Sequence, residues 1–100
     1  MKFARTETFK NSYSKLTAQE KKRIKLALGK LEANPYHPFP RGMRVHVLGG
    51  VKGEPLRQGD PPAPIWEFHA SLSLIITFQY GEDLILLRNC GSHDKVLQKP

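Results

Sequence analysis

The chain has 100 residues, which suffices for one domain with a modest core and is too short for a second domain. Lys and Arg outnumber Asp and Glu by 16 to 9, and the net charge of +7 favours a polyanionic partner such as nucleic acid, or serves solubility alone. The single cysteine, Cys90, excludes an intramolecular disulfide, and no apolar run approaches the length of a membrane span.

The N-terminal segment predicts a short strand followed by a helix. Met1 to Arg5 has no apolar signal core, so we expect a cytoplasmic protein. Residues 2–6 can form the strand. From Glu7 to Leu16 the spacing is helical, with Phe9, Tyr13 and Leu16 on one face.

A second helix is predicted from Thr17 to the Asn34-Pro35 pair. Thr17 and Glu20 form a capping box, in which each side chain satisfies a free amide at the helix start. The residue before a proline is pushed out of the α region, which ends the helix. The apolar stripe, which should face a sheet as part of a two-helix hairpin, consists of Ile24, Ala27, Leu28 and Leu31.

The middle of the chain predicts one strand and one long loop. From Met43 to Leu48 the residues alternate, which places His46 on the side opposite Met43 and Val45. Residues 49–64 have no periodicity and are rich in Gly and Pro. A loop of that length is uncommon in a compact domain and is usually mobile or functional.

Three apolar runs near the C-terminus predict a meander of antiparallel strands, Ile65–Ala70, Leu74–Tyr80 and Leu84–Cys90. Residues 94–100 form a turn of helix or a tail. The order of elements predicts one α+β domain over residues 1–100. In it an N-terminal strand and a two-helix hairpin pack on an antiparallel four- to five-stranded sheet. The other face of the sheet should stay open and collect basic and histidine side chains.

The histidines suggest RNA cleavage without a metal. Such a site needs one group to take the proton of a ribose 2′-hydroxyl, another to protonate the departing 5′-oxygen, and cations to stabilise the phosphoryl oxygens. Histidine suits both proton transfers because its ordinary pKa is about 6.5. Three histidines come from separate strand positions, His46, His69 and His93. The candidate cations for phosphate and RNA are Arg44, Lys52, Arg57 and Arg88.

Structural explanations exist for each of these residues. A single histidine on a strand is more often a hydrogen-bonded structural residue. Zinc is bound by three histidines and water in some catalytic sites, but close ligand spacing is lacking here, so we expect no metal and no cofactor. Glu67 alternates onto the side of His69, where it can orient that ring or make a cross-strand ion pair. Trp66 and Phe68 fall on the opposite side, as core residues.

Several segments together resemble the RelE/ParE superfamily of bacterial toxin–antitoxin toxins over nearly the full length. They are the opening strand with Phe9-x-x-x-Tyr13-x-x-Leu16, the Asn34-Pro35 helix end, the Trp66–His69 segment and the closing Leu86–Asp94 segment. The Gly-Ser-His ending is the most specific. Within the superfamily the chain is most similar to the YafQ branch, which has a histidine before Leu-x-Gly, another before the hairpin and a third in the terminal motif.

The resemblance implies a metal-independent endoribonuclease that cleaves mRNA in the ribosomal A site and inhibits translation. Its partners would be the ribosome, mRNA and an antitoxin, with the toxin as a monomer or in an antitoxin-bound hetero-oligomer. His69 or His46 would be the general base and His93 the general acid. The chain departs from the family pattern at Ser73, Leu74 and Ile75. These departures motivate an alternative, a non-catalytic ParE-like toxin that binds DNA gyrase or an inactive RNA-binding relative.

Overall fold

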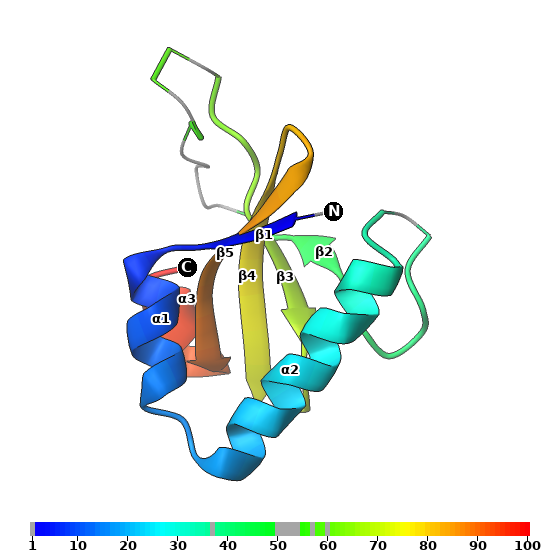
Figure 1. The fold of residues 1–100 in the computed structure, drawn as a ribbon, viewed down its shortest axis with the longest axis vertical. Coiled ribbons are helices and arrows are strands. Elements are labelled where there is room, and N and C mark those ends of the chain that lie inside the picture. The colour runs from blue at the N-terminus through cyan, green and yellow to red at the C-terminus, as the bar shows by residue number, and fades with distance from the viewer. Residues whose placement is uncertain (1, 37, 50–54, 57, 60) are drawn as a thin grey trace.

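The computed structural model describes residues 2–36, 38–49, 55–56, 58–59 and 61–100. Strand β1 and helices α1 and α2 come first, strands β2 to β5 follow, and helix α3 ends the chain (Figure 1). Their bounds are β1 Lys2–Arg5, α1 Glu7–Ser14, α2 Ala18–Ala33, β2 His46–Val47, β3 Trp66–His69, β4 Leu74–Gly81, β5 Leu84–Ser92 and α3 His93–Gln98. The predicted α+β class is confirmed.

The five strands form one sheet in the order β1-β5-β4-β3-β2. Strands β2 to β5 pair antiparallel, as the short connections after β3 and β4 require. Strand β1 differs from the expected antiparallel pattern because it pairs with β5 in parallel, with Lys2 opposite Leu84. These two strands come from opposite ends of the chain, so no hairpin forces them to run in opposite directions. The sheet is therefore mixed.

Helices α1 and α2 cover one face of this sheet (Figure 1). Thr6 caps α1 by accepting a hydrogen bond from the Phe9 amide, and its own hydroxyl donates to the Arg88 carbonyl in β5. The predicted capping box of α2 is present, since Thr17 accepts from the Glu20 amide and Glu20 accepts from the Thr17 amide. The start of each helix is thus fixed by its own sequence.

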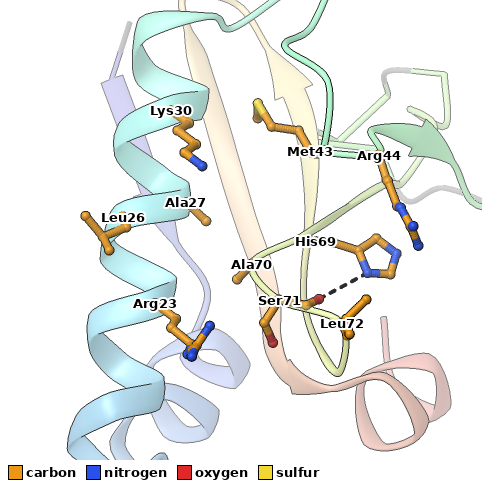
Figure 2. Close-up of a pocket in the computed structure, with 11 residues that line it drawn as sticks. Arg23, Leu26, Ala27, Lys30, Met43, Arg44, His69, Ala70, Ser71 and Leu72 are labelled. Carbon is orange, nitrogen blue, oxygen red and sulfur yellow. Dashed lines mark hydrogen bonds between the residues drawn. The ribbon is translucent and has the colours of Figure 1, made fainter.

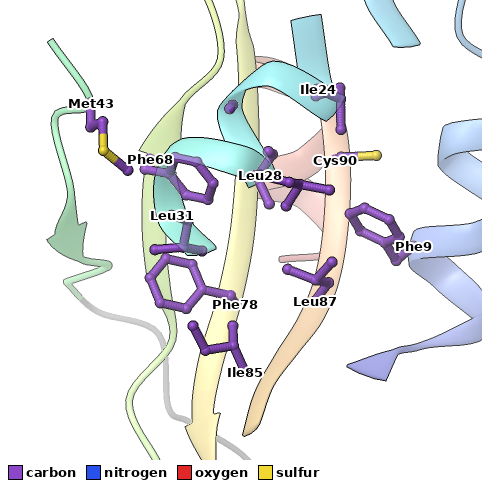
Figure 3. Packing of buried hydrophobic residues seen from close by; sticks show 12 residues of the cluster. Phe9, Ile24, Leu28, Leu31, Met43, Phe68, Phe78, Ile85, Leu87 and Cys90 are labelled. Carbon is purple, nitrogen blue, oxygen red and sulfur yellow. The ribbon is translucent and has the colours of Figure 1, made fainter. Parts of the chain in front are cut away.

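The core lies between these two helices and the sheet (Figure 3). Phe68 and Phe78 meet edge to face, with ring centroids 5.6 Å apart, and Trp66 packs against the same cluster. The prediction that Trp66 and Phe68 face the core is confirmed. The buried members of the cluster are Phe9, Ile24, Ala27, Leu28, Leu31, Met43, Phe68, Ile76, Phe78, Ile85, Leu87 and Cys90.

The predicted strand Met43–Leu48 is wrong in extent, since the strand β2 comprises only His46 and Val47. Arg44 has a φ of +52°, a left-handed conformation that interrupts the alternation expected of a strand. As a result Met43 is buried while Val47 is exposed. Residues 41 and 42 form a turn before this strand, closed by a hydrogen bond from the Met43 amide to the Pro40 carbonyl.

Helix α3 lies on the face of the sheet opposite α1 and α2, behind β5 in Figure 1. Gly91 leads into it with a φ of +141°, a conformation that favours glycine, and buried Val96 approaches Gly91 from the helix. The Asn89 amide donates to the Lys99 carbonyl, which fastens the chain end to β5. The face expected to stay open is therefore partly covered. No described helix has both the length and the apolar character needed to cross a membrane.

The cysteine is a packed thiol, as predicted, because Cys90 lies in the core next to Ile24 (Figure 3). Burial raises the pKa of the Cys90 thiol to about 12. At pH 8 the reactive thiolate is then a fraction of only about 10⁻⁴ of the folded protein. We expect iodoacetamide to leave the native protein unmodified at pH 8 and to alkylate it in concentrated urea, as followed by mass spectrometry. Rapid alkylation of the native protein would contradict this packing.

Candidate active site

Three imidazoles converge on one buried carboxylate. The Nε2 atoms of His46, His69 and His93 lie 3.3, 3.6 and 3.9 Å from the same oxygen, Oε1 of Glu67. The Glu67 side chain is 3% exposed, whereas those of His46 and His93 are 53% and 45% exposed. The carboxylate therefore forms the floor of the site, and the rings line its open side. The three predicted histidines lie together.

The sheet register explains this convergence. Trp66 and Phe68 point into the core, so Glu67 and His69 emerge on the opposite face of β3. Strand β2 places His46 directly opposite Glu67. His93 arrives from the end of β5, where its backbone amide donates to the Ser73 carbonyl at 3.0 Å. Each ring is thus held by a different element: His46 by β2, His69 by β3 and His93 by the first residue of α3.

Backbone carbonyls orient two of the rings. His46 Nδ1 lies 3.1 Å from the Arg44 carbonyl oxygen, and His69 Nδ1 lies 3.3 Å from that of Ser71. A carbonyl only accepts, so each of these nitrogens carries a proton. The Nε2 atoms of both rings face the Glu67 carboxylate, which accepts a hydrogen bond from whichever Nε2 carries a proton.

His93 is placed to exchange protons with the same centre. Its ring stacks on that of His69, with centroids 6.2 Å apart and planes 26° from parallel. A carboxylate next to several imidazoles offsets the charge of one protonated ring. His69 and His93 therefore lie side by side, each with Nε2 toward Glu67.

The predicted cations differ in their environments. Arg44 is exposed and adjoins His46, whose ring contacts its carbonyl. Arg88 is half-buried, and its guanidinium donates to Gln79 Oε1 at 2.8 Å and to the Pro100 carbonyl at 3.0 Å. It fastens β5 to the chain end as well as adding positive charge to this face. Lys52 and Arg57 lie outside the described residues.

The positions that depart from the family pattern serve structural purposes. Leu74 and Ile75 are buried at the start of β4, and Ile75 pairs with His69 across the strands. Ser73 is exposed, and its carbonyl receives the His93 amide. Glu67 is a residue of the site that was not among the predicted site residues. The alternation of side chains along the strand places Glu67 on the same face as His69, but it does not show that His46 and His93 contact the same carboxylate.

The three rings converge on the carboxylate oxygen itself. Among the residues that the structure describes, no group of three or more His, Cys, Asp or Glu side chains is arranged to hold a metal ion. Two of the rings, His46 and His69, also have a backbone carbonyl beside Nδ1.

Comparison with known proteins identifies the fold. No protein-family model matches the sequence, and no curated protein matches it either. Several solved structures match the fold of the chain. A metal-bound toxin from Helicobacter pylori is 20% identical with a TM-score of 0.70, and the match covers 96% of this chain and 98% of that one.

Two further solved structures are toxins in complex with antitoxins. The E. coli DinJ–YafQ complex matches with 17% identity and a TM-score of 0.64, over 94% of each chain. The RelB–RelE antitoxin–toxin complex from Methanococcus jannaschii matches with 13% identity and a TM-score of 0.65, over 97% of this chain and 99% of that one. The chain has the RelE-like fold of these toxins, which confirms the resemblance expected from the sequence.

Proposed function

We propose that the protein is the toxin of a toxin–antitoxin system and acts as a metal-independent endoribonuclease. The observation that carries the proposal is the convergence of three imidazoles on Glu67, on a partly open face of a basic protein. An acid, a base and positive charge in one place are what cleavage by the 2′-hydroxyl of RNA requires.

The histidines divide the two proton transfers. The Nε2 atom of His69 or His46 removes the proton of the ribose 2′-hydroxyl, and the 2′-oxygen attacks the adjacent phosphorus. The bond between phosphorus and the 5′-oxygen breaks, and protonated His93 gives its proton to that leaving oxygen. The products are a 2′,3′-cyclic phosphate and a 5′-hydroxyl. Glu67 stabilises the ring that becomes protonated.

Arg44 is the preferred cation for the phosphoryl oxygens. It is exposed beside His46, and a guanidinium can donate to two phosphate oxygens at once. Arg88 contributes charge from the same face while holding Gln79. Lys52 and Arg57 stay as predicted RNA contacts that the described residues do not address.

The proposed substrate is mRNA in the ribosomal A site, and the proposed cellular result is arrest of translation in the cytoplasm. A cognate antitoxin would silence the toxin. This part of the proposal rests on the likeness of the fold to toxins solved with their antitoxins, DinJ–YafQ and RelB–RelE.

Mapping mRNA ends after brief induction tests this function. We expect new 5′-hydroxyl ends within codons and an early fall in translation for the wild type. Neither should occur for the variant in which His46, His69 and His93 are all alanine. A triple variant that stays fully toxic would refute the nuclease. If DNA replication stops first and no new mRNA ends appear, the gyrase-binding alternative is correct.

A further inference from the structure

A second hollow adjoins the histidine cluster on the side of helix α2. It is a cavity of about 410 Å³ between α2, the turn that precedes β2 and the β3–β4 turn (Figure 2). Ala27 and Met43 supply an apolar wall, and Arg23 and Lys30 project from α2 toward the sheet. We refer to it below as the α2 pocket.

His69 belongs to both the histidine cluster and the α2 pocket. Its Nε2 atom faces Glu67 in the cluster, while its Nδ1 atom faces the Ser71 carbonyl on the pocket wall. Arg44 also lines the pocket, and its backbone carbonyl is the one that the His46 ring contacts. His69 and Arg44 are therefore shared by the cluster and the pocket, which makes the two sites neighbours.

The chemistry of the lining suits a nucleotide. Three cations, Arg23, Lys30 and Arg44, line the pocket, and no Asp or Glu does so among the described residues. By contrast, the hollow beside the β4–β5 turn contains Glu82. Leu72 also lines the pocket and is 87% exposed, so its apolar surface is accessible. Single-strand RNA sites combine a positively charged groove with rings on which bases stack, and here the cations and the His69 ring line one pocket.

We propose that the α2 pocket binds a nucleotide of single-stranded RNA next to the one whose phosphate is cleaved. The inference rests on the proposed ribonuclease function, because it takes the histidine cluster as the scissile centre. In this proposal Arg23 and Lys30, two of the basic residues of α2, bind a phosphate that flanks the scissile one. Arg23 and Lys30 position the substrate and take no part in proton transfer.

Charge reversal on the two sides of α2 provides a matched test. The pocket variant is Arg23→Glu with Lys30→Glu, and the control is Lys22→Glu with Lys25→Glu. All four residues are exposed on α2, both pairs change the net charge equally, and neither control residue lines the α2 pocket. Thermal unfolding of both variants verifies that the fold is kept.

The probe is a 2′-O-methylated single-stranded RNA of about 12 nucleotides, which fills a typical single-strand site and has no 2′-hydroxyl to attack. Its affinity is measured by fluorescence anisotropy at several salt concentrations. We expect the pocket variant to bind this RNA at least about tenfold more weakly than the wild type. The slope of log affinity against log salt concentration should become shallower by about one or more. The RNA affinity of the control variant should fall by less than about threefold, because only its net charge has changed.

Shortening the RNA from either end locates the contact. At one end, removal of nucleotides should abolish the difference between wild type and pocket variant, because the RNA no longer reaches the pocket. Equal losses in pocket and control variants, a difference that survives truncation at both ends, or no binding by the wild type would each overturn the proposal. Binding at the pocket without any cleavage of mRNA on ribosomes would refute the ribonuclease and leave the α2 pocket as an RNA-binding site alone.

Discussion

Replacing His93 with alanine is expected to lower the rate of RNA cleavage by about 10²- to 10⁴-fold, the usual contribution of one general acid. The side chain is 45% exposed and the backbone amide that bonds Ser73 is kept, so the fold should survive. The leaving 5′-oxygen would then depart without a proton from the protein. Single-turnover cleavage on ribosomes programmed with a defined mRNA measures the rate.

Gln98→Ala is the matched control for this variant, because Gln98 is exposed on the same short helix and uncharged. It should cleave at the wild-type rate. A His93→Ala variant that cleaves within twofold of wild type would remove this residue from the mechanism.

Replacing Glu67 with glutamine is expected to lower the cleavage rate by up to about 10²-fold, with little change in RNA affinity. The amide keeps the size of the carboxylate but removes the negative charge that offsets a protonated imidazole. Because Glu67 contacts three rings from three elements, the change also loosens their relative positions. Single-turnover rates and anisotropy with the 2′-O-methylated RNA separate the two effects.

Glu67→Asp is the second variant to compare, because it keeps the negative charge on a side chain that is one methylene shorter. We expect it to recover part of the activity that glutamine loses, which a purely structural role would not produce. Thermal unfolding of both variants provides the check on folding. Wild-type cleavage by Glu67→Gln would show that the carboxylate is a spectator and that the three rings act without it.

The local elements of this protein were predictable because their determinants are adjacent in sequence. A capping box needs only Thr17 and Glu20, and the end of α2 needs only the Asn34-Pro35 pair. Alternation in β3 was enough to send Phe68 to the core and His69 to the other face. The predicted strand before the loop failed where Arg44 adopts a left-handed conformation, which a period of two does not anticipate.

Residue type and short spacing were sufficient to predict the α+β class, the helix starts and the three histidines as candidates. Three other features became visible only in the folded chain: the three histidines surround Glu67, β1 pairs with β5 in parallel, and α3 covers part of the second face of the sheet. Each of these depends on strand register and on contacts between residues far apart in the chain. Such contacts are set by how the whole sheet buries its apolar face, and no local pattern encodes them.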